Sequence, residues 1–136
     1  MRIIAGKNKG KKLKEFKGDK IRPTSDRAKE SLFNILGNKV LGCNFLDLCA
    51  GTGSIGLESF SRGANSVTFV DISKESLSLV KENANSIGLS ETFVLSSANN
   101  FLSSTDKKFD VIFFDPPYDF SEIKSILEIV NNRSLL

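Results

Sequence analysis

The chain has 136 residues, of which 40% are hydrophobic and 26% are charged. This length and balance fit one globular domain with a buried core and exclude a disordered chain. The sequence contains no histidine, which excludes Ser-His and Cys-His catalysis and argues against a zinc site, so we expect no metal. No apolar run is long enough to span a bilayer, and the N-terminus is too polar for a secretory signal. We therefore expect a cytoplasmic protein without a membrane partner.

Positive charge is concentrated at the N-terminus. Residues 1–22 contain nine Lys or Arg and two acids, a net charge of +7, whereas the remainder carries −4. A basic arm on a mildly acidic body indicates a polyanionic partner, although a solvated lysine-rich tail would have the same composition. The runs Met1–Ala5 and Lys11–Phe16, separated by the turn-forming Gly6–Gly10, predict a β-hairpin whose cations would meet phosphates without reading sequence.

A helix is predicted after Pro23, with Thr24 or Ser25 as its N-cap. Apolar residues recur at helical spacing and predict a face packed on the main domain: Ala28, Leu32, Ile35 and Leu36. Arg22, Thr24 and Arg27 would lie at the mouth of this helix, where they could reach a ligand.

The rest of the chain alternates apolar runs with helical patterns. The predicted strands are Asn44–Cys49, Ser66–Asp71, Thr92–Ser96 and Phe109–Phe114. The predicted helices are Ser54–Arg62, Lys74–Ile87 with Leu77, Val80, Ala84 and Ile87 inward, and Ser121–Asn131 with Ile123, Ile126, Leu127 and Val130 inward. Strands buried on both faces and separated by helices indicate an α/β fold with a parallel sheet, in which a ligand lies beyond the carboxyl ends of the strands.

The first strand contains one acid, Asp47, and runs into Gly51-x-Gly53-x-x-Gly56. Glycines allow a sharp turn and a close approach to a ligand, and we expect the following helix to offer free N–H groups and a partial positive charge. Asp71 ends the next strand, 20 residues after Gly51, where a carboxylate can accept from both hydroxyls of a ribose. This arrangement is typical of a nucleotide-like ligand, although a glycine-rich connection without a ligand has the same form.

The fourth strand ends in Asp115-Pro116-Pro117-Tyr118. Prolines fix the backbone and donate no N–H, so the Pro116 carbonyl and the Asp115 carboxylate would face the site beside the ring of Tyr118. Two acceptors and a stacking surface suit a planar heterocycle with an exocyclic amine, because they aim the nitrogen lone pair and stabilise the charge that develops on methylation. A base inside a helix cannot reach such a pocket, so the target would be unpaired or flipped out. An ordinary turn is the alternative for this motif alone.

Two motifs, Asp47-Leu-Cys-Ala-Gly-Thr-Gly53 and Asp115-Pro-Pro-Tyr118, resemble those of class I S-adenosylmethionine-dependent amino-methyltransferases. The resemblance narrows to the RsmD family, which methylates guanine N2 in small-subunit ribosomal RNA of bacteria, and it runs from Met1 to about Tyr118. The blocks that carry it are Arg2-Ile-Ile-Ala-Gly6, Gly10-Lys-Lys-Leu13, Arg22-Pro-Thr-x-Asp-Arg27 with Leu32-Phe-Asn34, and Gly56-Leu-Glu-Ser-Phe-Ser-Arg-Gly-Ala64.

The resemblance implies a Rossmann-like class I methyltransferase domain at 23–136, preceded by a basic RNA-binding β-hairpin at 1–22, with S-adenosyl-L-methionine as cofactor. The implied cofactor-binding residues are Asp47, Ala50, Gly51, Gly53, Asp71, Ile72, Ser97, Ala98 and Asp115. The implied catalytic residues are Asp115, Pro116, Pro117 and Tyr118. The implied RNA contacts are Arg2, Lys7, Lys9, Lys11, Lys12, Arg22 and Arg27. Ser97 stands where the family often has Asp or Asn, which shortens its reach to adenine, and Asn83 is interpreted as structural.

The resemblance also implies a partner and an overall extent. The partner would be 16S rRNA or the assembling small ribosomal subunit, and the full-length parent is expected to be a monomer. Family members continue past the last predicted helix with further strands that complete the sheet. The chain is therefore expected to be truncated after the fourth strand and its helix, either as a fragment or as a natural product.

Three other functions are compatible with parts of the sequence. A DNA or RNA adenine-N6 methyltransferase would share the amine motif, and a non-catalytic RNA-binding module would explain the basic arm. A nicotinamide dehydrogenase would explain the glycine pattern, but it gives no reason for Asp115-Pro-Pro-Tyr118 and usually needs a histidine, which the chain lacks. The sequence does not distinguish naked RNA from a ribosomal particle, and it does not name the modified guanine.

Overall fold

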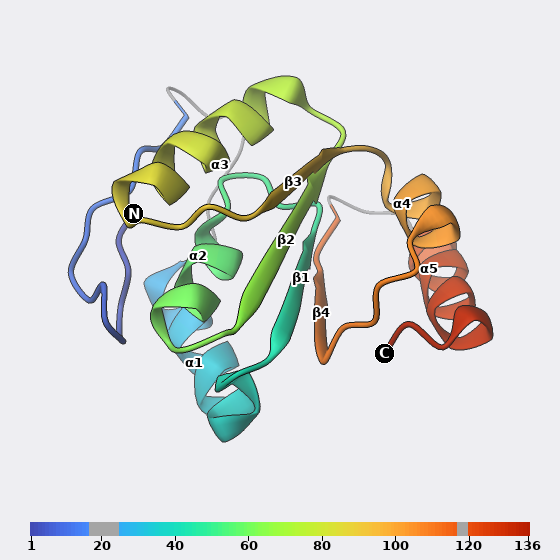
Figure 1. Cartoon of the computed structure of the whole chain (residues 1–136), viewed down its shortest axis with the longest axis horizontal. Helices are drawn as coiled ribbons and strands as arrows, with labels where there is room; N and C mark the ends of the chain where they lie inside the picture. The colour runs from blue at the N-terminus through green and yellow to red at the C-terminus, as the bar shows by residue number, and fades with distance from the viewer. Residues whose placement is uncertain (17–24, 117–119) are drawn as a thin grey trace.

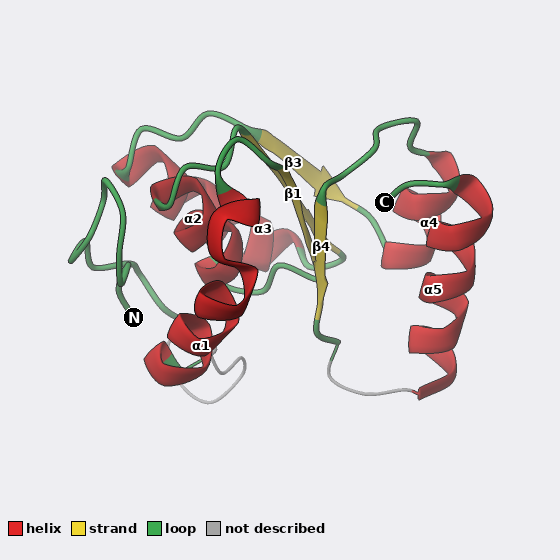
Figure 2. Ribbon diagram, turned by 90° about the horizontal axis from the view of Figure 1, so that it is seen from below, coloured by secondary structure: helices red, strands yellow, loops and turns green. Residues whose placement is uncertain are grey.

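A computed structural model describes residues 1–16, 25–116 and 120–136 of the chain. The described elements form three layers, with one sheet between two groups of helices (Figure 1). Seen along the sheet, α1, α2 and α3 lie on one face and α4 and α5 on the other (Figure 2). This is the predicted α/β arrangement.

The sheet has four parallel strands in the order β3-β2-β1-β4. Their bounds are β1 Asn44–Leu48, β2 Ser66–Asp71, β3 Thr92–Leu95 and β4 Val111–Phe114. The helices are α1 Asp26–Leu36, α2 Ser54–Ser61, α3 Lys74–Ser86, α4 Ala98–Ser104 and α5 Phe120–Arg133, with a 3-10 turn at Gly37–Val40. The predicted elements are confirmed to within a few residues at each end.

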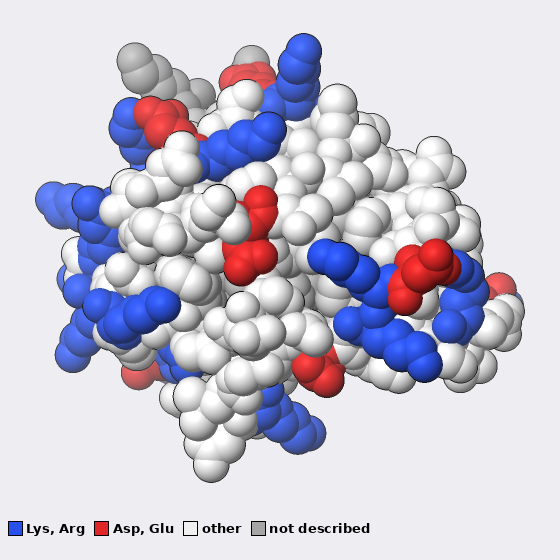
Figure 3. Space-filling view, in the orientation of Figure 1, with Lys and Arg blue, Asp and Glu red and all other residues white. Residues whose placement is uncertain are grey.

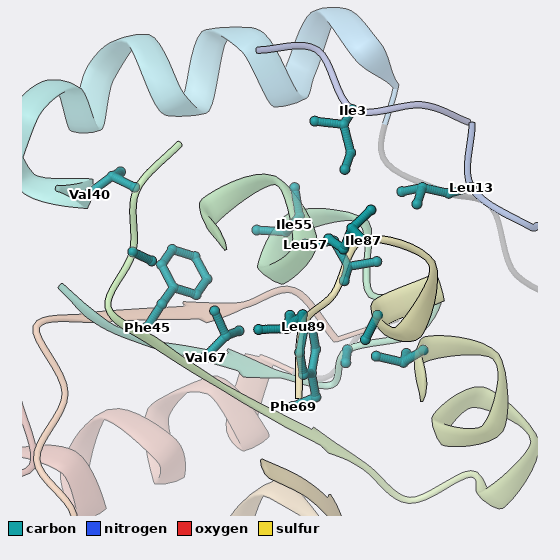
Figure 4. Packing of buried hydrophobic residues seen from close by; sticks show 14 of the residues in the cluster. Ile3, Leu13, Val40, Phe45, Ile55, Leu57, Val67, Phe69, Ile87 and Leu89 are labelled. Atoms are coloured by element: carbon teal, nitrogen blue, oxygen red, sulfur yellow. The ribbon is translucent and has the colours of Figure 1, made fainter. Parts of the chain in front are cut away.

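The central strands are buried on both faces, which is why they form the middle of a parallel sheet. Phe45, Val67 and Phe69 point into the core under α1, α2 and α3, where they meet Ile3 and Leu13 from the N-terminal segment (Figure 4). The alternate residues of β1 and β2 pack with α4 and α5 into the second core: Leu46, Leu48 and Val70. Because successive side chains of a strand point to opposite faces of the sheet, neighbouring residues of one strand pack into different cores.

Helix α1 buries only part of the predicted face: Leu32 and Leu36 pack against the core, and the other two predicted residues do not. Ala28 is exposed and Ile35 is 83% exposed, whereas Lys29 and Phe33 are buried. The Phe33 ring stacks on Phe45 with centroids 6.3 Å apart, and this contact turns the helix away from the predicted orientation. The prediction of Ala28 and Ile35 as core residues is wrong because a purely apolar count passed over a buried lysine.

Two further details differ from the prediction. Leu127 in α5 is 63% exposed, while Ile126 is buried against the sheet. Helix α4 was not predicted, because Ala98-Asn-Asn-Phe-Leu-Ser-Ser has weak helix propensity. It forms because the Ser97 hydroxyl caps it by accepting from Asn100 N at 3.1 Å and because Phe101 and Leu102 are buried.

The N-terminal segment 1–16, called the arm below, turns back on itself as predicted. Its antiparallel pairing consists of one bridge, Arg2 with Lys12, and flanking backbone hydrogen bonds such as Ile3 N to Lys11 O at 2.9 Å. The arm is thus a hairpin without extended regular strands. Ile3 and Leu13 fix it to the core.

We expect Phe33→Ala to lower the free energy of unfolding by about 3–5 kcal/mol, because it leaves a cavity against Phe45. The matched variant Ile35→Ala, two residues along the same helix, should change it by less than about 0.5 kcal/mol. Urea unfolding measures both values. Equal losses would contradict the observed face of α1.

Candidate active site

The turn between β1 and α2 lies at the carboxyl edge of the sheet. Its backbone takes positive φ at Cys49 (66°), Gly51 (59°) and Gly53 (80°). Gly53 N donates to Ala50 O at 2.8 Å and closes the turn. A Cβ at Gly53 would lie 2.9 Å from the side chain of Val80, so both the backbone angle and the space require glycine there.

Gly56 allows helix α2 to pack closely on strand β2. A Cβ at this position would lie 2.4 Å from the Phe69 ring and 3.0 Å from Val67, so its absence lets α2 lie directly against β2. The third glycine of the motif therefore positions the helix whose first turn forms one wall of the site.

The Asp71 carboxylate, half-buried at the end of β2, supports the turn. One oxygen accepts from Gly51 N at 2.8 Å and the other accepts from Ser73 N at 2.8 Å. Each carboxylate oxygen has a second lone pair, so Asp71 can still accept hydroxyl donors from a ligand.

Asp47 lies inside β1 and its carboxylate accepts from Gly56 N at 2.9 Å. The pKa of Asp47 is raised to about 7, mainly by burial; the Gly56 N–H opposes this rise, and the charge of Asp71 adds to it. The carboxylate stands between strand and helix, where a cationic group would favour its ionised form.

These contacts correct one expectation about the turn. The helix after the turn was expected to offer free N–H groups to a ligand, but the N–H groups of Gly51, Gly53 and Gly56 each donate within the protein. Two of the three acceptors are carboxylates. The Asp71 carboxylate therefore places negative charge beside the turn, where a dinucleotide site presents N–H groups to a pyrophosphate.

Ser97 and Ala98 lie at the same edge, after β3. Ser96 N donates to Asp71 O at 3.0 Å, which ties the end of β3 to the end of β2. The Ser97 oxygen is engaged as the cap of α4, and its hydroxyl proton remains available as a donor. Ile72 is 72% exposed beside Asp71 and offers an apolar surface.

The Asp-Pro-Pro-Tyr motif begins at this edge as well. Phe114 pairs in register with Leu48, so Asp115 and Pro116 follow β4 beside the glycine turn, with Asp115 exposed and Pro116 half-buried. Pro117 and Tyr118 lie outside the described residues, as does Arg22.

Acidic groups gather around Cys49 at the start of the turn. The pKa of its thiol is raised to about 12, first by burial and then by the charges of Asp71, Glu122, Asp47 and Asp115. Glu122, in the first turn of α5, was missed, because nothing in the sequence places that helix end near the turn. Four acidic side chains therefore lie near the start of the turn.

The predicted RNA contacts within the described residues lie away from that edge. Basic side chains gather over the arm on the opposite side of α2, at the left of Figure 3. The Lys7 ammonium lies 3.7 Å from the centroid of the Phe60 ring, and Arg2 pairs with Asp26 at 3.6 Å. Three exposed arm lysines make no ion pair with any described residue: Lys9, Lys11 and Lys12. Arg27 is exposed on α1.

Side chains of α2 and α3 that the sequence did not single out for this role hold the arm. Glu58 accepts from Ile4 N at 2.9 Å and Ala5 N at 3.1 Å, and the Ser61 hydroxyl donates to Ala5 O at 2.6 Å. The sequence signal for this role is a glutamate and three serines in a helix whose other residues are apolar or glycine.

The buried Asn83 side chain fastens the returning half of the arm. It accepts from Lys14 N at 2.7 Å and donates to Lys14 O at 3.0 Å, as a neighbouring strand would. The structural interpretation of Asn83 agrees with these contacts.

The family model described as "Conserved hypothetical protein 95" matches residues 1–136. The chain belongs to this family. The resemblance to the RsmD family is confirmed by curated relatives of the same type. The Haemophilus influenzae protein named "Ribosomal RNA small subunit methyltransferase D" is 36% identical over 141 residues, covering 100% of this chain and 73% of the relative. Its Escherichia coli K12 namesake is 31% identical over 137 residues, covering 100% of this chain and 69% of the relative.

Solved structures of relatives share the fold of this family member. The yhhF protein of Escherichia coli superposes with a TM-score of 0.89 at 30% identity, covering 98% of this chain and 73% of that one. A hypothetical protein of Thermus thermophilus gives 0.84 at 30% identity, covering 99% of this chain and 79% of that one. The methyltransferase fold class predicted from the sequence is confirmed.

No metal centre is formed by the described parts of the chain, which lack any group of three or more His, Cys, Asp or Glu side chains able to hold an ion. Within residues 1–16, 25–116 and 120–136, no helix has the length and apolar character needed to cross a membrane.

The raised pKa of Asp47 predicts a pH-dependent stability. Between about pH 4 and pH 7 the folded protein binds one proton more than the unfolded chain, so the free energy of unfolding falls as pH rises. Asp47→Asn keeps an acceptor for the Gly56 N–H but does not titrate. The fall in the free energy of unfolding across this pH range should therefore be smaller by a few kcal/mol, because each unit of pKa shift corresponds to about 1.4 kcal/mol.

Urea unfolding across that pH range measures this slope. Asp106→Asn is the matched control, because the Asp106 side chain is fully exposed and should leave the slope unchanged. A slope that survives in Asp47→Asn would contradict the protonation of Asp47 in the folded state.

Proposed function

We propose that the protein transfers a methyl group from S-adenosyl-L-methionine to the exocyclic N2 of a guanine in 16S rRNA of the small ribosomal subunit. The observation that carries the proposal is the charge of the turn. The N–H groups of Gly51, Gly53 and Gly56 donate within the protein, and the Asp71 carboxylate accepts the first of them. A site of this kind favours a cation over a pyrophosphate, which supports a sulfonium cofactor and disfavours a nicotinamide dinucleotide.

The chain's residues fit the parts of this cofactor. Asp71 would accept from the ribose hydroxyls, and Ile72 and Ala98 would flank the adenine, to whose ring nitrogens the Ser97 hydroxyl could donate. Asp47, Ala50, Gly51 and Gly53 would surround the methionine portion, whose ammonium group suits the acidic edge. When bound, S-adenosylmethionine supplies an electrophilic methyl group.

The acceptor side would be formed after β4. The Asp115 carboxylate and the Pro116 carbonyl would accept the two N–H bonds of the guanine amine, and Tyr118 with Pro117 would stack on the base. Holding both N–H bonds aims the nitrogen lone pair at the methyl carbon and stabilises the positive charge that develops on nitrogen. The proton can then leave to solvent, so neither a histidine base nor a nucleophilic side chain is needed.

The arm supports an RNA substrate. It carries Arg2, Lys7, Lys9, Lys11 and Lys12 on a backbone fixed to α2 and α3, and Arg22 and Arg27 would extend this surface. Cations placed in this way bind phosphates and position the RNA, while the pocket at the sheet edge selects the base. The names of the relatives given above support small-subunit ribosomal RNA as the class of substrate.

The decisive experiment follows a labelled methyl group from S-adenosylmethionine into unmodified small-subunit RNA, free or in 30S particles. We expect N2-methylguanine, identified by mass spectrometry of the nucleosides. Asp115→Ala should lower transfer more than about 100-fold, because the amine loses its charged acceptor, and should change the cofactor dissociation constant by less than about tenfold.

If the product is N6-methyladenine, the target base is adenine and the protein is an adenine-N6 methyltransferase with the same chemistry. RNA binding without any cofactor affinity would favour a non-catalytic RNA-binding module, and stabilisation by NAD alone would favour a dehydrogenase. Each of these results would contradict the proposed function.

The arm lysines should determine the salt dependence of RNA binding. Replacing Lys9, Lys11 and Lys12 together by Met removes three exposed cations, so the slope of log K against log salt should become shallower by about 2, at roughly 0.7–0.9 per lost phosphate contact. Filter binding at several salt concentrations measures it. The control is Lys14→Met, because Lys14 is on the same arm but already pairs with Glu82. An unchanged slope in the triple variant would contradict an RNA-binding role for these lysines.

A further inference from the structure

Lys29 occupies a core position of α1 with a side chain that is 0% exposed. An ammonium group has three donors, and here each has an acceptor from a different part of the chain. Arg2 O lies at 2.7 Å, Ser54 Oγ at 3.0 Å and Glu58 Oε1 at 3.5 Å. A buried ammonium persists only where such partners replace water, so these contacts define the place of the side chain.

Glu58 completes the arrangement from the other side. Its Oε1 also accepts from Ile4 N, and its Oε2 accepts from Ala5 N and from Arg62 Nε at 2.8 Å. Lys29 and Glu58 together therefore hold backbone groups of three arm residues: Arg2, Ile4 and Ala5. The arm is attached here by a buried ion pair.

The contact of Lys29 with Ser54 joins it to the candidate active site. Ser54 is the first residue of α2 and directly follows Gly53, which has no side chain to cap the helix. The Lys29 ammonium thus donates both to the Arg2 carbonyl and to the Ser54 hydroxyl at the end of the glycine turn. One buried charge joins the arm to the turn.

We propose that Lys29 is a positioning residue, which fixes the RNA-binding arm relative to the β1–α2 turn and so sets how bound RNA presents its target base to the methyl group. This role rests on the proposed function. Replacing a whole buried ion pair by apolar side chains is often neutral for stability, whereas removal of Lys29 alone leaves Glu58 buried with Arg62 and the N–H groups of the arm. An apolar side chain at position 29 would not direct the Arg2 carbonyl and the Ser54 hydroxyl toward one point.

The test compares Lys29→Met with Lys29→Arg and with Lys14→Met. Lys14→Met removes one charge of the same arm from an exposed ion pair. Steady-state kinetics on small-subunit RNA give kcat and KM, calorimetry gives the cofactor dissociation constant, and hydrogen exchange follows the Ile4 and Ala5 amides.

In Lys29→Met we expect kcat to fall about 10- to 100-fold through misalignment, with faster exchange at Ile4 and Ala5. The cofactor dissociation constant should change less than about threefold, since no cofactor contact is removed. Lys29→Arg keeps the donors and should recover most of the lost kcat. Lys14→Met should match the wild type.

Ser54→Ala provides a second test that leaves the ion pair in place. It should lower kcat without changing exchange at Ile4 and Ala5, because only the link to the turn is lost. A purely structural Lys29 would lower thermal stability but leave the kcat of folded protein unchanged. An active wild type with wild-type kcat in both Lys29→Met and Ser54→Ala would overturn the positioning role alone. A wild type that transfers no methyl group would overturn the proposed function and this role with it.

Discussion

Two carboxylates hold the turn after β1 against the strands that carry them. Asp71 accepts from the N–H of Gly51 and Asp47 accepts from that of Gly56, so these two backbone donors are used inside the protein. Asp115 and Glu122 lie near enough to the start of the turn to raise the pKa of the Cys49 thiol together with these two acids. The proposed preference of the site for a cation over a phosphate rests on this arrangement.

Helix α2 connects this edge to the rest of the molecule. Its eight residues begin at the turn, and Gly56 lets it lie directly on Phe69. Its buried polar side chains, Glu58 and Ser61, face the other way and hold the arm. Because one short helix contacts both parts, the acidic edge and the basic arm have a fixed relation despite their separation in sequence (Figures 1 and 3).

The elements that were predicted incorrectly depend on tertiary contacts of polar or capping residues. The strands were located well because an apolar run buried on both faces has few alternatives, and β2 begins and ends at the predicted residues. The face of α1 was predicted only in part, because a buried lysine with three partners breaks the apolar pattern. Helix α4 was missed because its stability comes from a cap and from burial of Phe101 and Leu102 more than from its own propensity.

The sequence by itself determined the class of fold, the glycine turn with its two acids, the Asp-Pro-Pro-Tyr motif and the concentration of positive charge in the arm. These are local patterns, and each follows from the residues within one element or turn. The tertiary structure alone decided which N–H groups the acids bind, which face of α1 is buried, and that Lys29 and Glu58 join the arm to the turn. The contacts of Lys29 join residues more than twenty positions apart, Arg2 at 27 and Ser54 at 25. They depend on how complete elements pack, which no local pattern specifies.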